Sequence, residues 1–272
     1  MVNPPQFNNI NDAQSWSLSL SDRPAECVRC WELEDIEQPS IRQAAIDRHR
    51  ILSQIKTDYL IVGGVLDSYC NSACMTCSAT LSTKIAKLEG NVFVMDNYEK
   101  FQELPHDRIV ELDVNGGEPT FSKNYKHLLD NLPANVKVVR INTNGSRYFE
   151  KVEELLQRKI KVIVTLSLDG TGNVHDFIRW PIRWVDYTKT VEKYIELRTK
   201  YKNLSLDFWT TLNRLNLANF ESIKEYAQAC AIPHQYGLLK RPAVLDINNT
   251  NEEELEQFVE QQMKLRGITW QQ

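Results

Sequence analysis

Residues 59–77 read YLIVGGVLDSYCNSACMTC. The first residues of this stretch, 59–65, are mostly apolar and partly β-branched, which predicts a buried β-strand. Cys70, Cys74 and Cys77 follow the strand and fall within eight positions. Thiolates are the ligands that select iron–sulfur clusters, zinc or copper(I). In a reducing compartment such a group of cysteines indicates metal or redox chemistry, so the stretch joins a strand to a metal-binding loop.

Short apolar runs alternate with helical segments along the rest of the chain. The expected strands are residues 59–65, 108–114, 136–142, 160–168, 204–212 and 235–239. The expected helices lie near residues 78–89, 123–131, 147–158, 185–200, 217–230 and 251–265, the last opened by Thr250 with Glu253. This alternation predicts an α/β fold with parallel strands joined by right-handed crossovers. The βα units are too few for a closed eight-stranded barrel, and they fit either a partial barrel or an open doubly wound sheet.

Residues 1–57 lack the alternation of strands and helices that begins at residue 58, and they are therefore predicted to form an N-terminal extension. Ser40 and Gln43 can form a capping box at the start of a helix. Cys27 and Cys30 have a chelating spacing without the further ligands that a closed site needs, so they fit a second cluster, a zinc or partner-completed site, or unligated thiols. We therefore expect the extension at residues 1–57, the α/β core at 58–248 and a C-terminal helix at 249–272.

The composition of the 272 residues excludes several classes of protein. Hydrophobic residues make up 42% and charged residues 25%, which is typical of a packed globular protein and rules out disorder of the whole chain. The 32 basic and 36 acidic residues form no long run of one sign, so nucleic-acid binding is not expected. No apolar stretch approaches the ~20 residues that span a bilayer, and the polar start differs from a signal peptide, so we expect a cytoplasmic protein without membrane attachment.

Polar and glycine-rich motifs follow the expected strands. They are Asn115-Gly116-Gly117-Glu118-Pro119 after the second, Asn142-Thr143-Asn144-Gly145 after the third, Ser167-Leu168-Asp169-Gly170 after the fourth, and Thr210, Thr211 and Asn213 after the fifth. The carboxyl ends of parallel strands meet at one edge of a sheet, which is where ligands bind in folds of this kind. We therefore expect these motifs and the cysteine loop to surround one site.

Two of these motifs together resemble a known enzyme family. The spacing Cys70-x3-Cys74-x2-Cys77 after the first strand, with Gly116-Gly117-Glu118-Pro119 after the second, resembles the radical S-adenosylmethionine (radical SAM) enzymes. Ser167-Leu168-Asp169-Gly170, with His175 and Arg179 further on, is similar to the SPASM or twitch-type branch, whose members modify peptides and proteins. The resemblance covers about residues 58–248 and implies a partial (β/α)6 barrel with an N-terminal extension and a C-terminal helix.

The resemblance implies a [4Fe-4S] cluster on Cys70, Cys74 and Cys77, with one iron left open to chelate the amino and carboxylate groups of S-adenosylmethionine. One electron from a flavodoxin- or ferredoxin-like donor would cleave S-adenosylmethionine to a 5′-deoxyadenosyl radical. This radical would abstract a hydrogen atom from a peptide, a protein side chain or a small metabolite. In such an enzyme the cofactor carries the chemistry, and the protein supplies orientation and a dry pocket.

The resemblance also assigns residues to S-adenosylmethionine binding. Gly116 and Gly117 would let the backbone approach the methionyl group, and Glu118 would accept a hydrogen bond from its ammonium group. Ser167 and Arg179 suit the ribose or the carboxylate. The full set of expected cofactor-binding residues is Gly116, Gly117, Glu118, Pro119, Asn144, Ser167, Asp169, Arg179, Thr210 and Asn213. Thr76 is not included, because the family has an aromatic residue at the position before the third cysteine.

Alternatives remain at this point. A zinc site with a remote fourth ligand would also use the thiolates, and a non-catalytic metal- or cluster-binding module could keep the same barrel. Several aromatic residues can line a substrate cavity or belong to the core, namely Trp180, Trp184, Phe208 and Trp209. Cys230 closes an expected helix on the side of the barrel away from the site, which predicts a buried structural thiol.

Overall fold

The computed structural model describes residues 30–31, 34–35, 40, 43 and 59–268, and it divides the chain into two compact units, residues 1–59 and 60–272. In the first unit, Ser40 Oγ accepts a hydrogen bond from the Gln43 amide at 3.0 Å, and the Ser40 amide donates to Gln43 Oε1 at 3.3 Å. These reciprocal bonds are the capping box expected from the sequence. The expected C-terminal helix belongs to the second unit.

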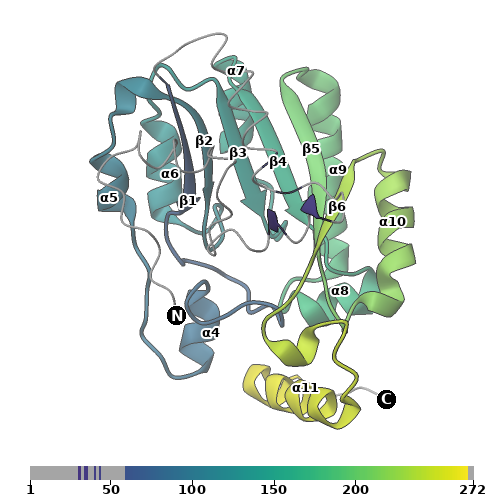
Figure 1. Ribbon diagram of the computed structural model, residues 1–272. Coiled ribbons are helices and arrows are strands. Elements are labelled where there is room, and N and C mark those ends of the chain that lie inside the picture. The colour runs from purple at the N-terminus through teal and green to yellow at the C-terminus, as the bar shows by residue number, and fades with distance from the viewer. Residues whose placement is uncertain (1–29, 32–33, 36–39, 41–42, 44–58, 269–272) are drawn as a thin grey trace. The chain divides into compact units, whose positions relative to one another are not determined.

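One sheet of six parallel strands, in the order β1-β2-β3-β4-β5-β6, forms the centre of the second unit (Figure 1). The strands are β1 Leu60–Val65, β2 Ile109–Asn115, β3 Val138–Thr143, β4 Lys161–Ser167, β5 Leu204–Leu212 and β6 His234–Leu238. The helices are α4 Thr83–Leu88, α5 Tyr98–Gln102, α6 Lys123–Asp130, α7 Lys151–Gln157, α8 Gly172–Ile178, α9 Trp184–Lys200, α10 Phe220–Ala229 and α11 Glu252–Arg266. Short 3-10 helices are η2 His106–Arg108, η3 Leu217–Asn219 and η4 Ala243–Leu245.

The strand order decides between the two architectures that the sequence left open. A doubly wound sheet reverses its strand order at a switch point, so that helices cover both of its faces. Here each crossover moves one strand along in the same direction. The crossover helices therefore gather on one face, where Figure 1 shows α6, α7, α9 and α10 along the outside of the curved sheet. The fold is the expected partial (β/α)6 barrel.

The two faces of the sheet differ in polarity, because side chains alternate between the faces along each strand. In β5, Leu206 and Phe208 are buried on the helix-covered face, whereas Asp207 and Trp209 point to the inner face. The apolar core therefore lies between the sheet and its helices. Polar side chains occupy much of the inner face, which leads up to the carboxyl ends of the strands.

Helix boundaries differ from the sequence-based expectations where a side chain caps the first turn. α4 begins after its N-cap Ser82, later than expected. α11 is capped by Asn251, whose side chain accepts a hydrogen bond from the Glu254 amide at 3.1 Å, and not by Thr250 with Glu253. The sequence analysis did not predict the short helices α5 and α8, which have five and seven residues.

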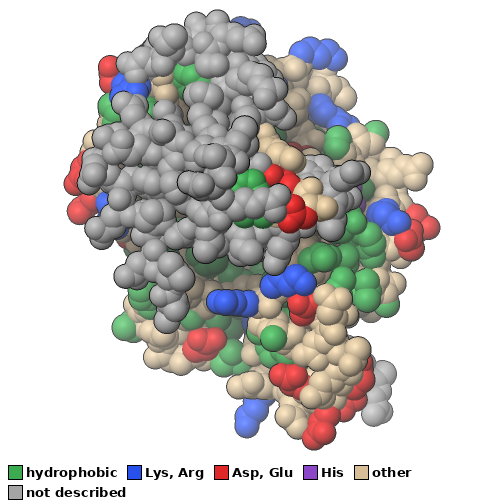
Figure 2. Space-filling model, viewed as in Figure 1, with side chains coloured by type: hydrophobic (Ala, Val, Ile, Leu, Met, Phe, Trp, Pro, Cys, Tyr) green, Lys and Arg blue, Asp and Glu red, His purple; other side chains and the backbone are tan. Residues whose placement is uncertain are grey.

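Charges of both signs are spread over the described residues on the face shown in Figure 2. The acidic side chains of α11 are Glu252, Glu253, Glu254, Glu256 and Glu260. This mixture agrees with the absence of a long run of one sign in the sequence. In the described part of the chain, no helix is both long enough and apolar enough to cross a bilayer.

His175 of α8 is fully buried against aromatic side chains of α9. Its ring centre lies 4.5 Å from that of Tyr187 and 5.3 Å from that of Trp184. Burial, and then the positive charge of Arg179, lower the pKa of His175 to about 3 from the usual 6.5. The ring is therefore neutral at physiological pH and packs as part of the core.

Substitution of His175 should change how the stability of the protein depends on pH. Because the folded-state pKa is lowered, the unfolded chain binds more protons between pH 6.5 and pH 3, and stability falls as the pH decreases through this window. We expect the unchanged protein to lose about 2 kcal/mol more of its unfolding free energy between pH 7 and pH 5 than His175→Phe. Urea unfolding at both pH values measures this difference, and equal losses in the two proteins would contradict it.

Candidate cofactor-binding site

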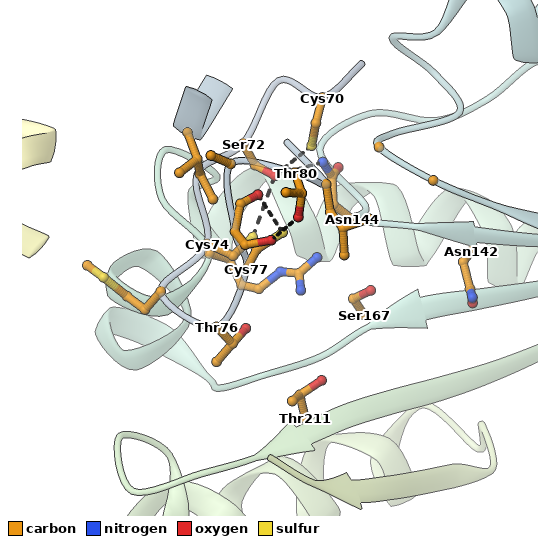
Figure 3. Close-up of a pocket in the computed structure, with 18 of the residues that line it drawn as sticks. Cys70, Ser72, Cys74, Thr76, Cys77, Thr80, Asn142, Asn144, Ser167 and Thr211 are labelled. Carbon is orange, nitrogen blue, oxygen red and sulfur yellow. Dashed lines mark hydrogen bonds between the residues drawn. The ribbon is translucent and has the colours of Figure 1, made fainter. Parts of the chain in front are cut away.

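A cavity of about 860 Å³ lies at the carboxyl ends of the strands (Figure 3). The cysteine loop between β1 and α4 forms one wall. The opposite wall comes from the ends of the strands and the residues that follow them, namely Asn115, Gly116, Gly117, Asn142, Asn144, Ser167 and Thr211. A cavity of this size accommodates a ligand as large as a drug molecule or a nucleoside cofactor.

The cysteine loop carries all three thiols of the expected site. Ser72 Oγ lies 3.3 Å from Cys70 Sγ and 3.5 Å from Cys74 Sγ, so one hydroxyl group stands between these two sulfurs. The Cys70 amide donates a hydrogen bond to Thr83 Oγ1 at 3.1 Å, which ties the start of the loop to α4. Cys77 borders the cavity on the same loop. Protein contacts thus define the shape of the loop.

The three thiols influence one another electrostatically. Burial of the Cys77 thiol group, and then the neighbouring charges of Cys74 and Cys70, together raise the pKa of Cys77 to about 12. Burial also raises the pKa of Cys70. Coordination to a metal deprotonates such thiols and supplies the positive charge that they need. Three free thiols on one loop therefore fit the ligand set of a [4Fe-4S] cluster with one iron left open.

Gly116 and Gly117 follow β2 and lie against the segment that leads to the first cysteine. The Gly117 amide donates to Asp67 O at 2.8 Å. A Cβ on Gly117 would lie 2.0 Å from Tyr69 O, and a Cβ on Gly116 would lie 2.4 Å from Asp67 O. The close approach that requires glycine is therefore made by the protein's own backbone. Both glycines also border the cavity, and their contact with the methionyl group stays a prediction.

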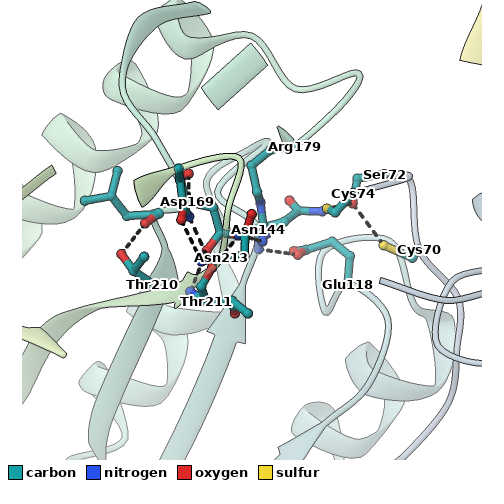
Figure 4. Close-up of polar contacts among 12 residues, drawn as sticks. Cys70, Ser72, Cys74, Glu118, Asn144, Asp169, Arg179, Thr210, Thr211 and Asn213 are labelled. Atoms are coloured by element: carbon teal, nitrogen blue, oxygen red, sulfur yellow. Dashed lines mark hydrogen bonds and ion pairs between the residues drawn. The ribbon is translucent and has the colours of Figure 1, made fainter. Parts of the chain in front are cut away.

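Glu118 is buried and joins the ends of β2 and β3 (Figure 4). Its Oε1 accepts hydrogen bonds at 2.8 Å from both Thr120 Oγ1 and Thr143 Oγ1, and its Oε2 accepts from the Asn144 amide at 2.7 Å. Burial raises the pKa of Glu118, while these hydrogen bonds oppose the shift. Glu118 is not among the residues that border the cavity, and its hydrogen bonds hold the ends of β2 and β3 together. Its expected bond to the ammonium group of S-adenosylmethionine stays a prediction.

Asn144 connects Glu118 to the cysteine loop. Its Nδ2 donates to Asn71 Oδ1 at 2.9 Å and to Ser72 Oγ at 3.3 Å. Ser72 in turn contacts the sulfurs of two of the cysteines. A continuous hydrogen-bond network thus runs from the end of β2, through the end of β3, to the thiols.

Arg179 and Asp169 form a buried ion pair with 2.8 Å between Nη1 and Oδ2. Asp169 Oδ1 accepts the Thr211 amide at 2.7 Å, which fixes the carboxylate. Burial by itself lowers the pKa of Arg179, but the charges of Cys74 and Asp169 raise it above its ordinary value. Arg179 borders the cavity, and its Nε has no hydrogen-bond partner in the described part of the chain. A guanidinium group beside the cavity can donate hydrogen bonds to a ligand bound there.

Thr210 and Asn213 do not border the cavity. Thr210 shares the helix-facing side of β5 with Phe208, and its Oγ1 donates to Leu168 O. Asn213 is buried, and its Nδ2 donates to Thr211 O at 2.7 Å. Thr211 borders the cavity instead, because it lies on the inner face. The alternation of apolar residues along β5 already indicated in the sequence that Thr210 and Thr211 lie on opposite faces of the sheet.

The other candidate residues fall into two groups, those that border the cavity and those that are buried away from it. Ser167 borders the cavity, whereas Pro119 is buried away from it. Among the aromatic candidates, Trp209 borders the cavity and is 39% exposed, whereas Phe208 belongs to the core.

The sequence analysis missed several residues of the cavity wall. Ser72 lies between two of the cysteines, but a single hydroxyl group in a loop shows no pattern. Asn142 belongs to the motif expected after the third strand, and it also borders the cavity. Phe258 and Gln262 of α11 also border the cavity. No local signal could have placed them there, because they are far from the cysteines in the sequence.

The predicted second metal site lies largely outside the described residues. Cys27 lies outside them, and Cys30 is a free cysteine of intermediate exposure. The role of this pair stays a prediction. Cys230 is also free, and it is half-buried at the end of α10, not fully buried as expected.

Substitution of Gly117 should disturb the cysteine loop. The Cβ of Gly117→Ala would collide with the backbone at Tyr69, which cannot move without shifting the chain that leads to Cys70. We expect a loss of about 1–3 kcal/mol of unfolding free energy, measured by urea unfolding. Gly63→Ala is the matched control, because its Cβ would lie 3.5 Å from its nearest neighbour, Asp113 O. Equal stability of the two variants would contradict the prediction.

Comparison with known proteins places these features in a family. The model of the Radical SAM superfamily matches residues 67–227. The mycofactocin maturase MftC of Mycobacterium tuberculosis (strain CDC 1551 / Oshkosh) is 32% identical over 111 residues, which are 40% of this chain and 28% of MftC. The sporulation killing factor maturation protein SkfB of Bacillus subtilis (strain 168) is 25% identical over 182 residues, which are 60% of this chain and 43% of SkfB. The matches therefore span less than half of either curated relative.

The fold is also shared with a solved structure. The crystal structure of Streptococcus suis SuiB bound to precursor peptide SuiA covers 97% of this chain and 62% of the SuiB chain, with a TM-score of 0.51 and 13% identity. The family's cofactors are a [4Fe-4S] cluster and S-adenosylmethionine, and the three free thiols on the cavity wall fit the cluster. Because the family match covers more than half of the chain and includes the three cysteines and the Gly-Gly-Glu-Pro motif, the chain belongs to the radical SAM superfamily.

Proposed function

We propose that this chain is the barrel of a radical SAM enzyme that modifies a peptide or protein by abstracting a hydrogen atom. The chemistry that the bound cofactors supply is the reductive cleavage of S-adenosylmethionine to a 5′-deoxyadenosyl radical. One observation carries the proposal: the cavity has three thiols on one wall and the polar inner face of an open half-barrel on the other. The names of MftC and SkfB as maturation proteins support a peptide substrate.

The inner face of the sheet presents both donors and acceptors of hydrogen bonds. Arg140 Nε lies 2.7 Å from Glu111 Oε1 and 3.9 Å from Asp113 Oδ2. Closer to the cavity, Asn142 Nδ2 donates to Asn115 Oδ1 at 2.5 Å. Amide and carboxylate groups of this kind suit the N–H and C=O groups of a peptide better than an apolar metabolite. The half-barrel has no further strand beyond β6 among the described residues, which suits an extended substrate.

The residues of this chain have distinct tasks in the proposed reaction. Cys70, Cys74 and Cys77 would hold the cluster, and the network from Glu118 through Asn144 would keep their loop in place. Arg179, which borders the cavity, would donate from its guanidinium group to an acceptor on S-adenosylmethionine. The other expected cofactor residues have two proposed tasks. Ser167 would complete the cavity wall around S-adenosylmethionine, and Asp169, Thr210 and Asn213 would support that wall from behind.

We also propose the electron donor and the compartment. A flavodoxin- or ferredoxin-like protein would reduce the cluster, because the reaction consumes one electron that the chain's own side chains do not supply. The reducing cytosol is the proposed location. The described cysteines are all free, and thiols stay reduced in that compartment. The proposed parts of the chain are the extension, 1–57, the barrel, 58–248, and the terminal segment, 249–272.

The proposal predicts that a hydrogen atom is transferred from a peptide to the 5′-deoxyadenosyl radical, which gives 5′-deoxyadenosine. Anaerobically reconstituted protein with dithionite would be incubated with a fully deuterated peptide digest or with the matching deuterated free amino acids. We expect deuterium in 5′-deoxyadenosine with the peptides and not with the amino acids. The control is the Cys70→Ala, Cys74→Ala, Cys77→Ala triple variant, which should form no 5′-deoxyadenosine. Failure of the loaded, reduced protein to form any 5′-deoxyadenosine would favour a non-catalytic cluster-binding module.

Substitution of Arg179 should weaken S-adenosylmethionine binding. Loss of a charge-assisted hydrogen bond costs roughly 1.5–3 kcal/mol, so we expect Arg179→Met to bind about ten- to hundred-fold more weakly in calorimetry. Arg183→Met is the control, because the Arg183 side chain is 70% exposed and pairs with Asp176 at the surface. Equal affinity of the two variants would show that Arg179 does not contact the cofactor. Circular dichroism checks that both variants fold.

A further inference from the structure

Arg266, at the end of α11, contacts the backbone of the cysteine loop. Its Nε donates to Ala73 O at 2.8 Å, and its Nη2 lies 3.4 Å from Cys74 O. Its Nη1 donates to the Oε1 of Gln262, one turn earlier in the helix, at 2.6 Å. The guanidinium thus links the C-terminal helix to the segment between the first two cysteines. α11 lies outside the residues that the family model matches, 67–227.

The charge of Arg266 needs compensation, because the residue is only 5% exposed. Its hydrogen bonds within the described chain go to neutral carbonyl and amide oxygens. Burial lowers the pKa of Arg266, whereas the negative charges of Cys74, Glu89 and Cys77 oppose this shift. A buried guanidinium is costly unless negative charge lies nearby. The guanidinium lies against the backbone of Cys74, so thiolates on this loop would supply the negative charge that its hydrogen-bond partners lack.

The other end of α11 is held separately. Arg214, in the loop after β5, donates to Asn251 O at 2.9 Å and pairs with Glu252 Oε1 at 2.6 Å. A helix of this length spans about 22 Å. α11 therefore runs from the loop after β5 to the loop after β1, with Phe258 and Gln262 on the cavity wall between the two anchors. In Figure 1 it lies beyond the carboxyl ends of the strands.

We propose that Arg266 is a positioning residue for the iron–sulfur cluster, which clamps the cysteine loop through the Ala73 and Cys74 carbonyls and keeps a positive charge beside the cysteine sulfurs. The clamp fixes the loop backbone that carries Cys70 and Cys74, which would hold the cluster. The charge would favour the reduced cluster, which carries one more electron. The proposal depends on the family's cluster and not on the identity of the substrate.

Two readouts separate the clamp from the charge in reconstituted full-length protein. The first is the anaerobic rate of iron release to the chelator bathophenanthroline. The second is the midpoint potential of the cluster from an electron paramagnetic resonance titration without S-adenosylmethionine. Arg266→Met removes both the clamp and the charge, and Arg266→Lys keeps the charge but cannot reach both carbonyls. Lys264→Met is the control, because Lys264 is an exposed cation on the same helix.

We expect iron release to be about tenfold faster in Arg266→Met and Arg266→Lys than in Lys264→Met, because each has lost charge-assisted hydrogen bonds to the loop. We expect a lower midpoint potential in Arg266→Met alone. The proposal is overturned if Arg266→Met matches Lys264→Met in both measurements. If Arg266→Met does not fold, Arg266→Lys decides, and slow iron release from that variant overturns the clamp. Because neither readout uses a peptide, failure of the proposed function leaves this test unaffected.

Discussion

The contact between the Gly116–Gly117 backbone and the Asp67–Tyr69 backbone supports the rest of the site. Gly117 N and Glu118 N donate to Asp67 O and Tyr69 O at 2.8 and 2.7 Å, which extends the pairing of β1 and β2 beyond their last residues. The chain that leaves β1 is therefore held against the end of β2 until it reaches the first cysteine. Any side chain at Gly117 would collide with the Tyr69 backbone and break this contact. The position of the cysteine loop therefore depends on a glycine at this site.

Charge balance is a second constraint on the cavity. Buried thiols and a buried carboxylate lie close to two buried guanidinium groups, those of Arg179 and Arg266. Arg179 is oriented by Asp169 from the end of β4, and Arg266 reaches the loop from α11. Positive charge from two distant parts of the chain is thus brought to the cysteine loop. These charges would offset the repulsion among the thiolates once a cluster is bound.

The sequence by itself determined the fold class and pointed to several residues that border the cavity. Short apolar runs predicted all six strands, and their regular alternation with helices predicted parallel pairing. The cysteines and the Gly-Gly-Glu-Pro motif were identifiable because they are local patterns with fixed spacing. Ser167 and Arg179 were found through the same kind of local motif, and both border the cavity.

Only the tertiary structure decided which polar residues face the cavity and which support it. Thr210 and Thr211 are chemically alike in the sequence, but the pleat of β5 turns them to opposite faces of the sheet. Glu118 resembles a ligand in the sequence, yet three neighbouring residues from two strand ends use its carboxylate oxygens. Arg266 is more than 190 residues from Ala73, and no local pattern records that the last helix returns to the first loop. Such contacts depend on the sequential curling of the sheet, which brings the ends of the chain's βα units to one edge and is a property of the assembled fold.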